Sequence, residues 1–143
     1  MNLKDAAARG VNVIHRTLFN VTKGRVGGRM FRMPVVMLVT TGRKTGRRRQ
    51  TMLTSPVQEG DNVVLVASYG GDPRHPTWFL NLRENPEVEI TMQGKTRLMT
   101  GRAASDDERA RLWPLIVERY KGYGQYQTRT EREIPVVILE PRP

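Results

Sequence analysis

The chain has 143 residues, a length that suits one domain with a sizeable core. It contains no cysteine, which excludes disulfides, thiolate catalysis and cysteine metal sites, and its two histidines, His15 and His75, lie too far apart in sequence to favour a zinc site. The net charge of +10 is uneven, because residues 1–50 carry 12 Lys or Arg against one acid and residues 51–143 carry 12 against 13, so we expect an anionic partner near the first third.

Residues 1–33 are interpreted as a separate N-terminal segment, made of an amphipathic helix and a connector rich in Gly and Arg. Within residues 3–22 an apolar stripe recurs at spacings of three and four, formed by Val11, Ile14, Leu18 and Val21. The stripe predicts a helix packed on a small barrel. A basic helix resting on a membrane surface is the alternative.

Residues 34–143 predict a single domain of strands and helices. Strands are expected at residues 35–41, 48–56, 63–68, 88–92, 95–100 and 135–139. A short helix is expected over residues 76–85, and a second helix begins at the capping box of residues 105–108 and should be kinked by Pro114. Six strands in hairpins with helices outside them indicate an α+β fold around a small antiparallel barrel.

The turn between the first two expected strands is the strongest functional signal. Five cations crowd it, namely Arg43, Lys44, Arg47, Arg48 and Arg49. Such a cluster repels itself unless an anion binds, and the turn offers backbone amides, the Thr45 hydroxyl and guanidinium groups to phosphate or carboxylate. The spacing is not that of a P-loop. An exposed strand edge made soluble by charge is the alternative interpretation.

Three other segments are candidates for binding or chemistry. Small residues end the third strand at 66–71, where a ligand can approach the backbone. The short helix carries Trp78 and the polar Asn81, and core packing is the alternative there. Tyr120, Tyr123 and Tyr126 recur every three residues and should share a face. Without a plausible Ser–His–Asp or Cys–His arrangement, an enzyme of this sequence needs a cofactor.

Together these segments resemble the deazaflavin-dependent nitroreductase family, whose members bind reduced coenzyme F-420. The resemblance rests on residues 40–46, 67–71, 76–86, 120–126 and 134–137. It implies a split β-barrel of about six mostly antiparallel strands with peripheral helices. It also implies a cytoplasmic enzyme, either a monomer or a homodimer, with a peripheral position on the inner face of the membrane as a further expectation.

The resemblance also implies roles for individual residues. The coenzyme phosphate and glutamate tail would contact Arg43, Lys44, Thr45 and Arg49. The deazaflavin ring would lie beside Gln50, Thr51, Met52, Leu53 and Thr54, mostly along their backbone. The phosphate end would be lined by Val66, Ala67, Ser68 and Tyr69, and the short helix would flank the coenzyme with Thr77, Trp78 and Asn81. Tyr123 would close over the ring, and the substrate would face Tyr120 and Tyr126.

The implied reaction is hydride transfer from the reduced deazaflavin to an activated alkene or enone, a quinone or a nitroaromatic. Three residues depart from the family pattern, because Tyr69 replaces a basic or amide side chain and Gln50 and Met52 replace residues that are often smaller or Pro. Three alternatives remain open: an FMN- or heme-binding split barrel, a nucleic-acid binder that uses residues 1–50, and a module that binds membranes.

Overall fold

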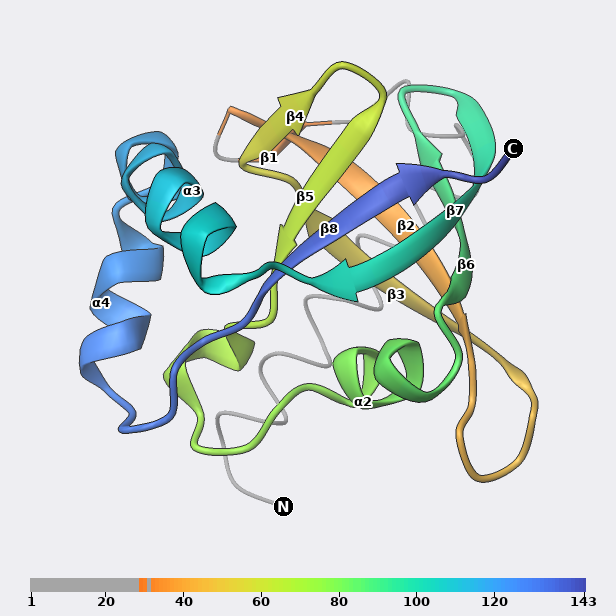
Figure 1. Ribbon diagram of the computed structural model, residues 1–143, viewed down its shortest axis with the longest axis horizontal. Helices are drawn as coiled ribbons and strands as arrows, with labels where there is room; N and C mark the ends of the chain where they lie inside the picture. The colour runs from red at the N-terminus through yellow and green to blue at the C-terminus, as the bar shows by residue number, and fades with distance from the viewer. Residues whose placement is uncertain (1–28, 31) are drawn as a thin grey trace.

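The structure is a computed structural model that describes residues 29–30 and 32–143 (Figure 1). The helix expected over residues 3–22 and most of the connector lie outside the described residues. The strands are β1 (Arg29–Met30), β2 (Met33–Thr41), β3 (Arg48–Thr54), β4 (Val57–Glu59), β5 (Asn62–Val66), β6 (Glu87–Met92), β7 (Lys95–Ala103) and β8 (Val136–Pro141). The helices are the 3-10 turn η1 (Tyr69–Gly71), α2 (Thr77–Glu84), α3 (Asp106–Arg119) and α4 (Gly122–Thr128).

The strands form one antiparallel sheet in the order β1-β2-β6-β7-β8-β5-β4, with β3 on β2. Only Ser55 and Pro56 separate β3 from β4, so a single bent segment belongs to both ends of the sheet. Ser55 lies at the bend, where its N–H donates to Pro34 O at 3.0 Å and its hydroxyl to Val64 O at 2.7 Å. The sheet therefore curls into an open barrel whose discontinuity lies at this bend.

Two apolar clusters hold the helices to the sheet. The barrel interior contains Val36, Leu38, Leu65, Ile90 and Leu139, together with three side chains from α2. The other cluster packs α3 and α4 against the outside of the sheet, through residues that include Leu112, Ile116, Tyr123, Val66 and Ile138. Figure 1 agrees with this division, since α3 and α4 lie beside one flank of the barrel and α2 lies at one end.

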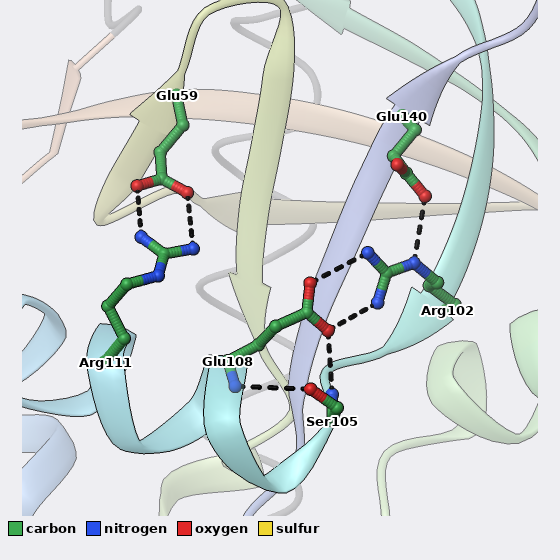
Figure 2. A network of polar contacts seen from close by, with 6 residues as sticks. All are labelled: Glu59, Arg102, Ser105, Glu108, Arg111 and Glu140. Carbon is green, nitrogen blue, oxygen red and sulfur yellow. Dashed lines mark hydrogen bonds and ion pairs between the residues drawn. The ribbon is translucent and has the colours of Figure 1, made fainter.

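The start of α3 is fastened to the sheet by ion pairs (Figure 2). Ser105 caps the helix by accepting from the Glu108 N–H, while the Glu108 carboxylate accepts from the Ser105 N–H, as the capping box predicts. Arg102 of β7 bridges Glu108 at 2.6 Å and Glu140 of β8 at 2.9 Å. Hydrogen bonds from Arg102 and the Ser105 N–H lower the pKa of Glu108 to about 2.

The sequence did not predict every detail of the fold. A kink was expected at Pro114, and α3 continues as one helix through this residue. Pro114 and Ala110 are exposed, so water can satisfy the carbonyl that the proline leaves without a helical donor. The described residues also contain two short strands that were not expected, β1 inside the connector and β4 after Pro56. Both are two or three residues long and have too few residues to show a period.

Candidate active site

The β2–β3 hairpin tip is a defined turn despite its charge. The Gly42 N–H donates to Arg47 O at 2.8 Å and the Gly46 N–H to Gly42 O at 2.8 Å. The Thr45 hydroxyl accepts from the Arg47 N–H at 3.2 Å. Gly46 has a φ of 72°, a left-handed conformation that suits glycine. Residues 43–50 are all exposed, so the predicted anion-binding side chains stand on an ordered, solvent-facing turn.

The buried amide of Asn81 on α2 fastens this tip to the barrel. Its Oδ1 accepts from the Arg43 N–H at 3.1 Å and from Arg43 Nη1 at 3.4 Å, and its Nδ2 donates to Thr40 Oγ1 at 3.4 Å. Asn81 is 2% exposed. Four residues later, Asn85 donates to Thr41 O at 3.5 Å. Asn81, which the resemblance places beside the coenzyme, thus contacts Arg43 directly, and α2 anchors the hairpin tip.

The cations of the hairpin divide between the two faces of β3. Arg48 pairs with Glu89 of β6 at 2.9 Å, so its charge is partly compensated. Arg49 is the cross-strand partner of Thr40 and therefore lies on the opposite face, the one that includes the barrel interior. Lys44 is exposed at the tip. Arg49 and Lys44 remain candidates for the expected anion contacts, whereas Arg48 is a partner of the sheet.

The five residues expected beside the ring alternate between the faces of β3. Gln50, Met52 and Thr54 lie on one face, and Thr51 and Leu53 lie on the other. Leu53 contacts the barrel core, whereas Met52 is buried with Val35 and Met37 on the opposite face. One planar ring cannot touch all five side chains, so contacts with several of them require the backbone of β3. In the described part of the chain, β3 pairs with β2 alone.

The three tyrosines expected at the substrate form a cluster at the far end of β3. Their ring centroids lie 5.3 Å (Tyr120–Tyr123), 6.4 Å (Tyr120–Tyr126) and 6.2 Å (Tyr123–Tyr126) apart. The hydroxyls of Tyr123 and Thr54 share a hydrogen bond of 3.3 Å. At about 3.4 Å per residue, the five steps from Arg49 to Thr54 span roughly 17 Å. One strand therefore links the basic hairpin to the tyrosine cluster.

Burial makes two of these phenols, Tyr123 and Tyr126, weaker acids than tyrosine in water. Burial raises the pKa of Tyr123, against the lowering effect of its hydrogen bond with Thr54. Burial, a hydrogen bond with Tyr120 and further neighbouring groups raise the pKa of Tyr126 to about 12. Both phenols therefore stay protonated at neutral pH. They can donate a hydrogen bond to a developing anion, but complete proton transfer from them is unfavourable.

The segment after β5 packs against α4. Val66 and Ala67 are buried in the two apolar clusters, and Ser68 is nearly buried. Tyr69, Gly70 and Gly71 have φ values of 44°, 62° and 82°. A Cβ on Gly71 would lie 2.7 Å from the Tyr126 carbonyl oxygen, so the two backbones approach more closely than any other residue would allow.

Arg132, which sequence reasoning missed, holds this same segment. Its guanidinium donates to Asp72 O at 2.9 Å, Ala67 O at 3.2 Å and Ser68 O at 2.9 Å. It also contacts Nδ1 of His75 at 3.2 Å. Burial and the charge of Arg132 lower the pKa of His75. No local pattern around Arg132 could have revealed these contacts, because its partners lie 57 to 65 positions away in sequence.

Trp78 and Thr77, the other residues of α2 that were expected to contact the coenzyme, differ in burial. Trp78 is 5% exposed and lies in the barrel core with an edge-to-face contact to Phe79, at a centroid distance of 6.2 Å. That position supports the core-packing alternative for Trp78. Thr77 is exposed at the start of α2.

Among the described helices, none is long and apolar enough to cross a membrane.

Comparison with known proteins identifies the family. The model of the F420H(2)-dependent quinone reductases matches residues 12–141. The chain belongs to this family. An F420H(2)-dependent quinone reductase of Mycobacterium tuberculosis is 42% identical over 133 residues, which cover 90% of this chain and 89% of the relative. The resemblance seen in the sequence is thereby confirmed, together with its coenzyme, F-420.

Solved structures agree with this family assignment. An F420-H2-dependent reductase named FDR-A is 42% identical with a TM-score of 0.68, and the match covers 75% of this chain and 94% of that one. A protein described as a domain-swapped dimer is 38% identical with a TM-score of 0.71, covering 90% of this chain and 96% of that one. The α+β fold with its antiparallel sheet is therefore shared with an F420-H2-dependent reductase.

Proposed function

We propose that this F-420-dependent reductase transfers a hydride to a quinone, and that the coenzyme lies along β3 from the basic hairpin to the tyrosine cluster. The observation that carries the proposal is the continuity of β3, which has Arg49 at one end and the Thr54–Tyr123 hydrogen bond at the other. These two side chains face opposite sides of β3, so the coenzyme would follow the backbone edge of the strand. The names of the relatives support a quinone as the acceptor.

The groups at the hairpin fit the anionic part of this coenzyme, which the resemblance describes as a phosphodiester with a glutamate tail. Arg43, Lys44 and Arg49 would hold these anions, with the Thr45 hydroxyl as a further polar group. Asn81 keeps Arg43 in place before binding, which lowers the ordering cost of binding. When bound, reduced F-420 supplies a hydride from C5.

The residues farther along β3 would orient the reaction and exclude water from it. The β3 backbone would contact the ring edge, as the alternation of its side chains requires. Tyr123 would cover the ring, while Tyr120 and Tyr126 would face the acceptor and donate hydrogen bonds to its developing oxyanion. Because the pKa of Tyr126 is about 12, solvent is the proposed source of the proton that completes the hydroquinone.

Fluorescence titration with oxidised F-420, with FMN titrated in parallel, tests the coenzyme site. Lys44→Ala and Arg49→Ala should each weaken F-420 binding by about 1–3 kcal/mol, the range for a charge-assisted contact. Lys95→Ala is the matched control, since Lys95 is an exposed cation beside the other hairpin turn, Gln93–Gly94. Unchanged affinity in both hairpin variants would place the anion site elsewhere, and a preference for FMN would refute the coenzyme assignment.

Turnover measurements test the acceptor separately. With reduced F-420 as donor, quinones should be reduced faster than enones or nitroaromatics at equal concentration. Rapid reduction of an enone with no activity on quinones would keep the coenzyme site and overturn the proposed substrate class.

The same proposal extends to the arrangement of the chain. Residues 34–143 would form most of the coenzyme-binding split barrel, to which β1 and Met33 also contribute. The protein would be cytoplasmic and would form a homodimer, as the domain-swapped relative suggests. Residues 1–22 would bring it to lipophilic quinones at the inner face of the membrane.

Two experiments test these proposals. The full chain should float with anionic liposomes, whereas a chain that lacks residues 1–22 should not, and light scattering should give twice the mass of one chain. Equal flotation would rule out the segment as the membrane contact, and a monomer mass would rule out the dimer.

A further inference from the structure

We propose that Arg132 is a positioning residue for hydride transfer, which keeps the coenzyme-lining segment after β5 and the tyrosine-bearing helix α4 in one fixed geometry. The inference rests on the proposed function and on the expectation, from the family resemblance, that residues 66–69 line the coenzyme, because only together do these give the two elements parts in one reaction. Arg132 itself touches neither coenzyme nor acceptor in this proposal, and it acts through the backbone that it holds.

One side of the arrangement is the set of backbone carbonyls that Arg132 collects. Its guanidinium donates to the carbonyl oxygens of Ala67, Ser68 and Asp72, at distances between 2.9 and 3.2 Å. These three residues span the turn that includes Tyr69, Gly70 and Gly71. A planar guanidinium has five donors in a rigid fork, so it can fix several carbonyls at once, whereas an ammonium group cannot reproduce that geometry.

The other side is the attachment of Arg132 to α4. Gln127 of α4 donates to Arg132 O at 2.8 Å, and its Oε1 accepts from the Ile134 N–H at 2.9 Å. Arg109 of α3 donates to the same Oε1 at 3.2 Å and to Ile134 O at 3.2 Å. The segment that carries Arg132 is therefore held by two helices, and α4 is also the helix of Tyr123 and Tyr126.

The two sides also meet directly. Gly71 packs so closely against the Tyr126 carbonyl that no side chain fits between them. This contact prevents the segment from moving toward α4, and the fork of Arg132 prevents it from moving away. Misplacement of reacting groups by about 1 Å can lower a rate by about 100-fold. Loss of Arg132 should therefore affect the reaction more than its distance from the ring suggests.

Arg132→Ala tests the inference, with Arg142→Ala as the matched control. Arg142 is likewise partly buried and donates to a backbone carbonyl, Val88 O at 3.1 Å, and pairs with Glu87. It follows β8 and lies outside the coenzyme segment. Arg132→Ala should lower kcat/KM by roughly 10- to 100-fold at temperatures well below its melting temperature. Arg142→Ala should keep kcat/KM within about twofold of the unchanged protein.

Chemical rescue separates positioning from general destabilisation. Guanidinium ion at a few tens of millimolar should restore part of the activity of Arg132→Ala, while sodium chloride at the same ionic strength should not. Arg132→Lys, which retains the charge without the fork, should remain impaired. An Arg132→Ala protein that is folded and as active as the unchanged protein, or equal losses in the Arg142 variant, would overturn the inference. Loss of activity in folded Arg132→Ala that guanidinium does not restore would also count against it.

Hydrogen exchange and coenzyme affinity give readouts that do not depend on turnover. The amides of residues 67–72 should exchange faster in Arg132→Ala, or in Arg132→Lys if the alanine variant does not fold, and F-420 should bind several-fold more weakly. If the amides of residues 67–72 exchange at the same rate in the variant as in the wild-type protein, the inference is refuted, even if the wild-type enzyme reduces quinones. If the unchanged protein binds F-420 but reduces no quinone, the proposed acceptor fails, while exchange and affinity still decide the role of Arg132.

Discussion

Replacing Asn81 by Leu should weaken coenzyme binding from a position that need not touch the coenzyme. Leucine resembles asparagine in size and keeps α2 packed on the barrel, but it removes three hydrogen bonds to the hairpin. Arg43 would keep its charge and lose the amide that orients both its backbone and its guanidinium.

The size of the effect follows from how exposed each lost partner is. The Arg43 N–H lies on an exposed residue and can turn to water, so its loss costs about 0.5–1.5 kcal/mol. Thr40 is 2% exposed, so the loss of the hydrogen bond from Asn81 to its buried hydroxyl costs about 1–3 kcal/mol. We therefore expect the free energy of unfolding to fall by about 2–4 kcal/mol. A charged contact is worth about 1.5–3 kcal/mol, and partial loss of the Arg43 contact should weaken F-420 binding by about 3- to 10-fold.

Fluorescence titration of F-420 and urea unfolding measure the two effects separately. Asn85→Leu is the matched control, because Asn85 caps the end of the same helix, its loss removes a single 3.5 Å bond to Thr41 O, and Arg43 stays untouched. If Asn81 acts through Arg43, the double variant Asn81→Leu/Arg43→Ala should bind no more weakly than Arg43→Ala alone. Full additivity, or unchanged affinity in a destabilised Asn81→Leu protein, would refute the reasoning.

Three further predictions concern other elements. Gly71→Ala should lower the free energy of unfolding, measured by urea titration, by about 2–4 kcal/mol, because it combines left-handed strain with overpacking on α4. Gly60 has a φ of 61° and no atom within 4 Å of an added Cβ, so Gly60→Ala should cost only the strain of about 1–2 kcal/mol. Equal losses in the two variants would show that the close approach of Gly71 to α4 is unimportant. The pKa of Glu108 is about 2 in the folded protein and near 4.5 in the unfolded chain, so its contribution to stability is complete above about pH 4.5 and is lost as the pH falls toward 2. Glu108→Gln should therefore flatten the pH dependence of the free energy of unfolding between these values. An unchanged slope would contradict the stabilising role of the Arg102 ion pairs. Tyr123→Phe should lower kcat more than it weakens F-420 binding if the hydroxyl stabilises the transition state, and a change confined to affinity would argue against that role.

Signals confined to a few neighbouring residues predicted most of the fold. The glycines at both hairpins, the capping box at Ser105 and the proline before α2 each determine local geometry, and the structure has the corresponding elements. The tyrosine cluster also followed from a spacing of three. Such features depend on backbone preferences that neighbouring residues set without help from the rest of the chain.

Contacts between distant segments could not be predicted in this way. Asn81 was predicted to flank the coenzyme, but its contact with Arg43 was not predicted, because Arg43 lies 38 positions earlier. The Thr54–Tyr123 hydrogen bond joins residues 69 positions apart. Arg132 lies in a short segment before β8 that has no period or motif. The positions of these side chains depend on how the sheet curls, which one-dimensional patterns do not specify.

The place of β8 in the sheet has a consequence for how the chain acquires its shape. β8 is the last of the described strands along the chain, yet it pairs with β5 on one side and β7 on the other. A growing polypeptide on the ribosome therefore cannot join these two parts of the sheet until residues 136–141 have been made. Strand pairing over such long sequence separations forms slowly, because the entropy cost of closing the loop comes before the stabilising contacts are made. The nascent protein should remain open, and unable to bind coenzyme, until synthesis has passed β8.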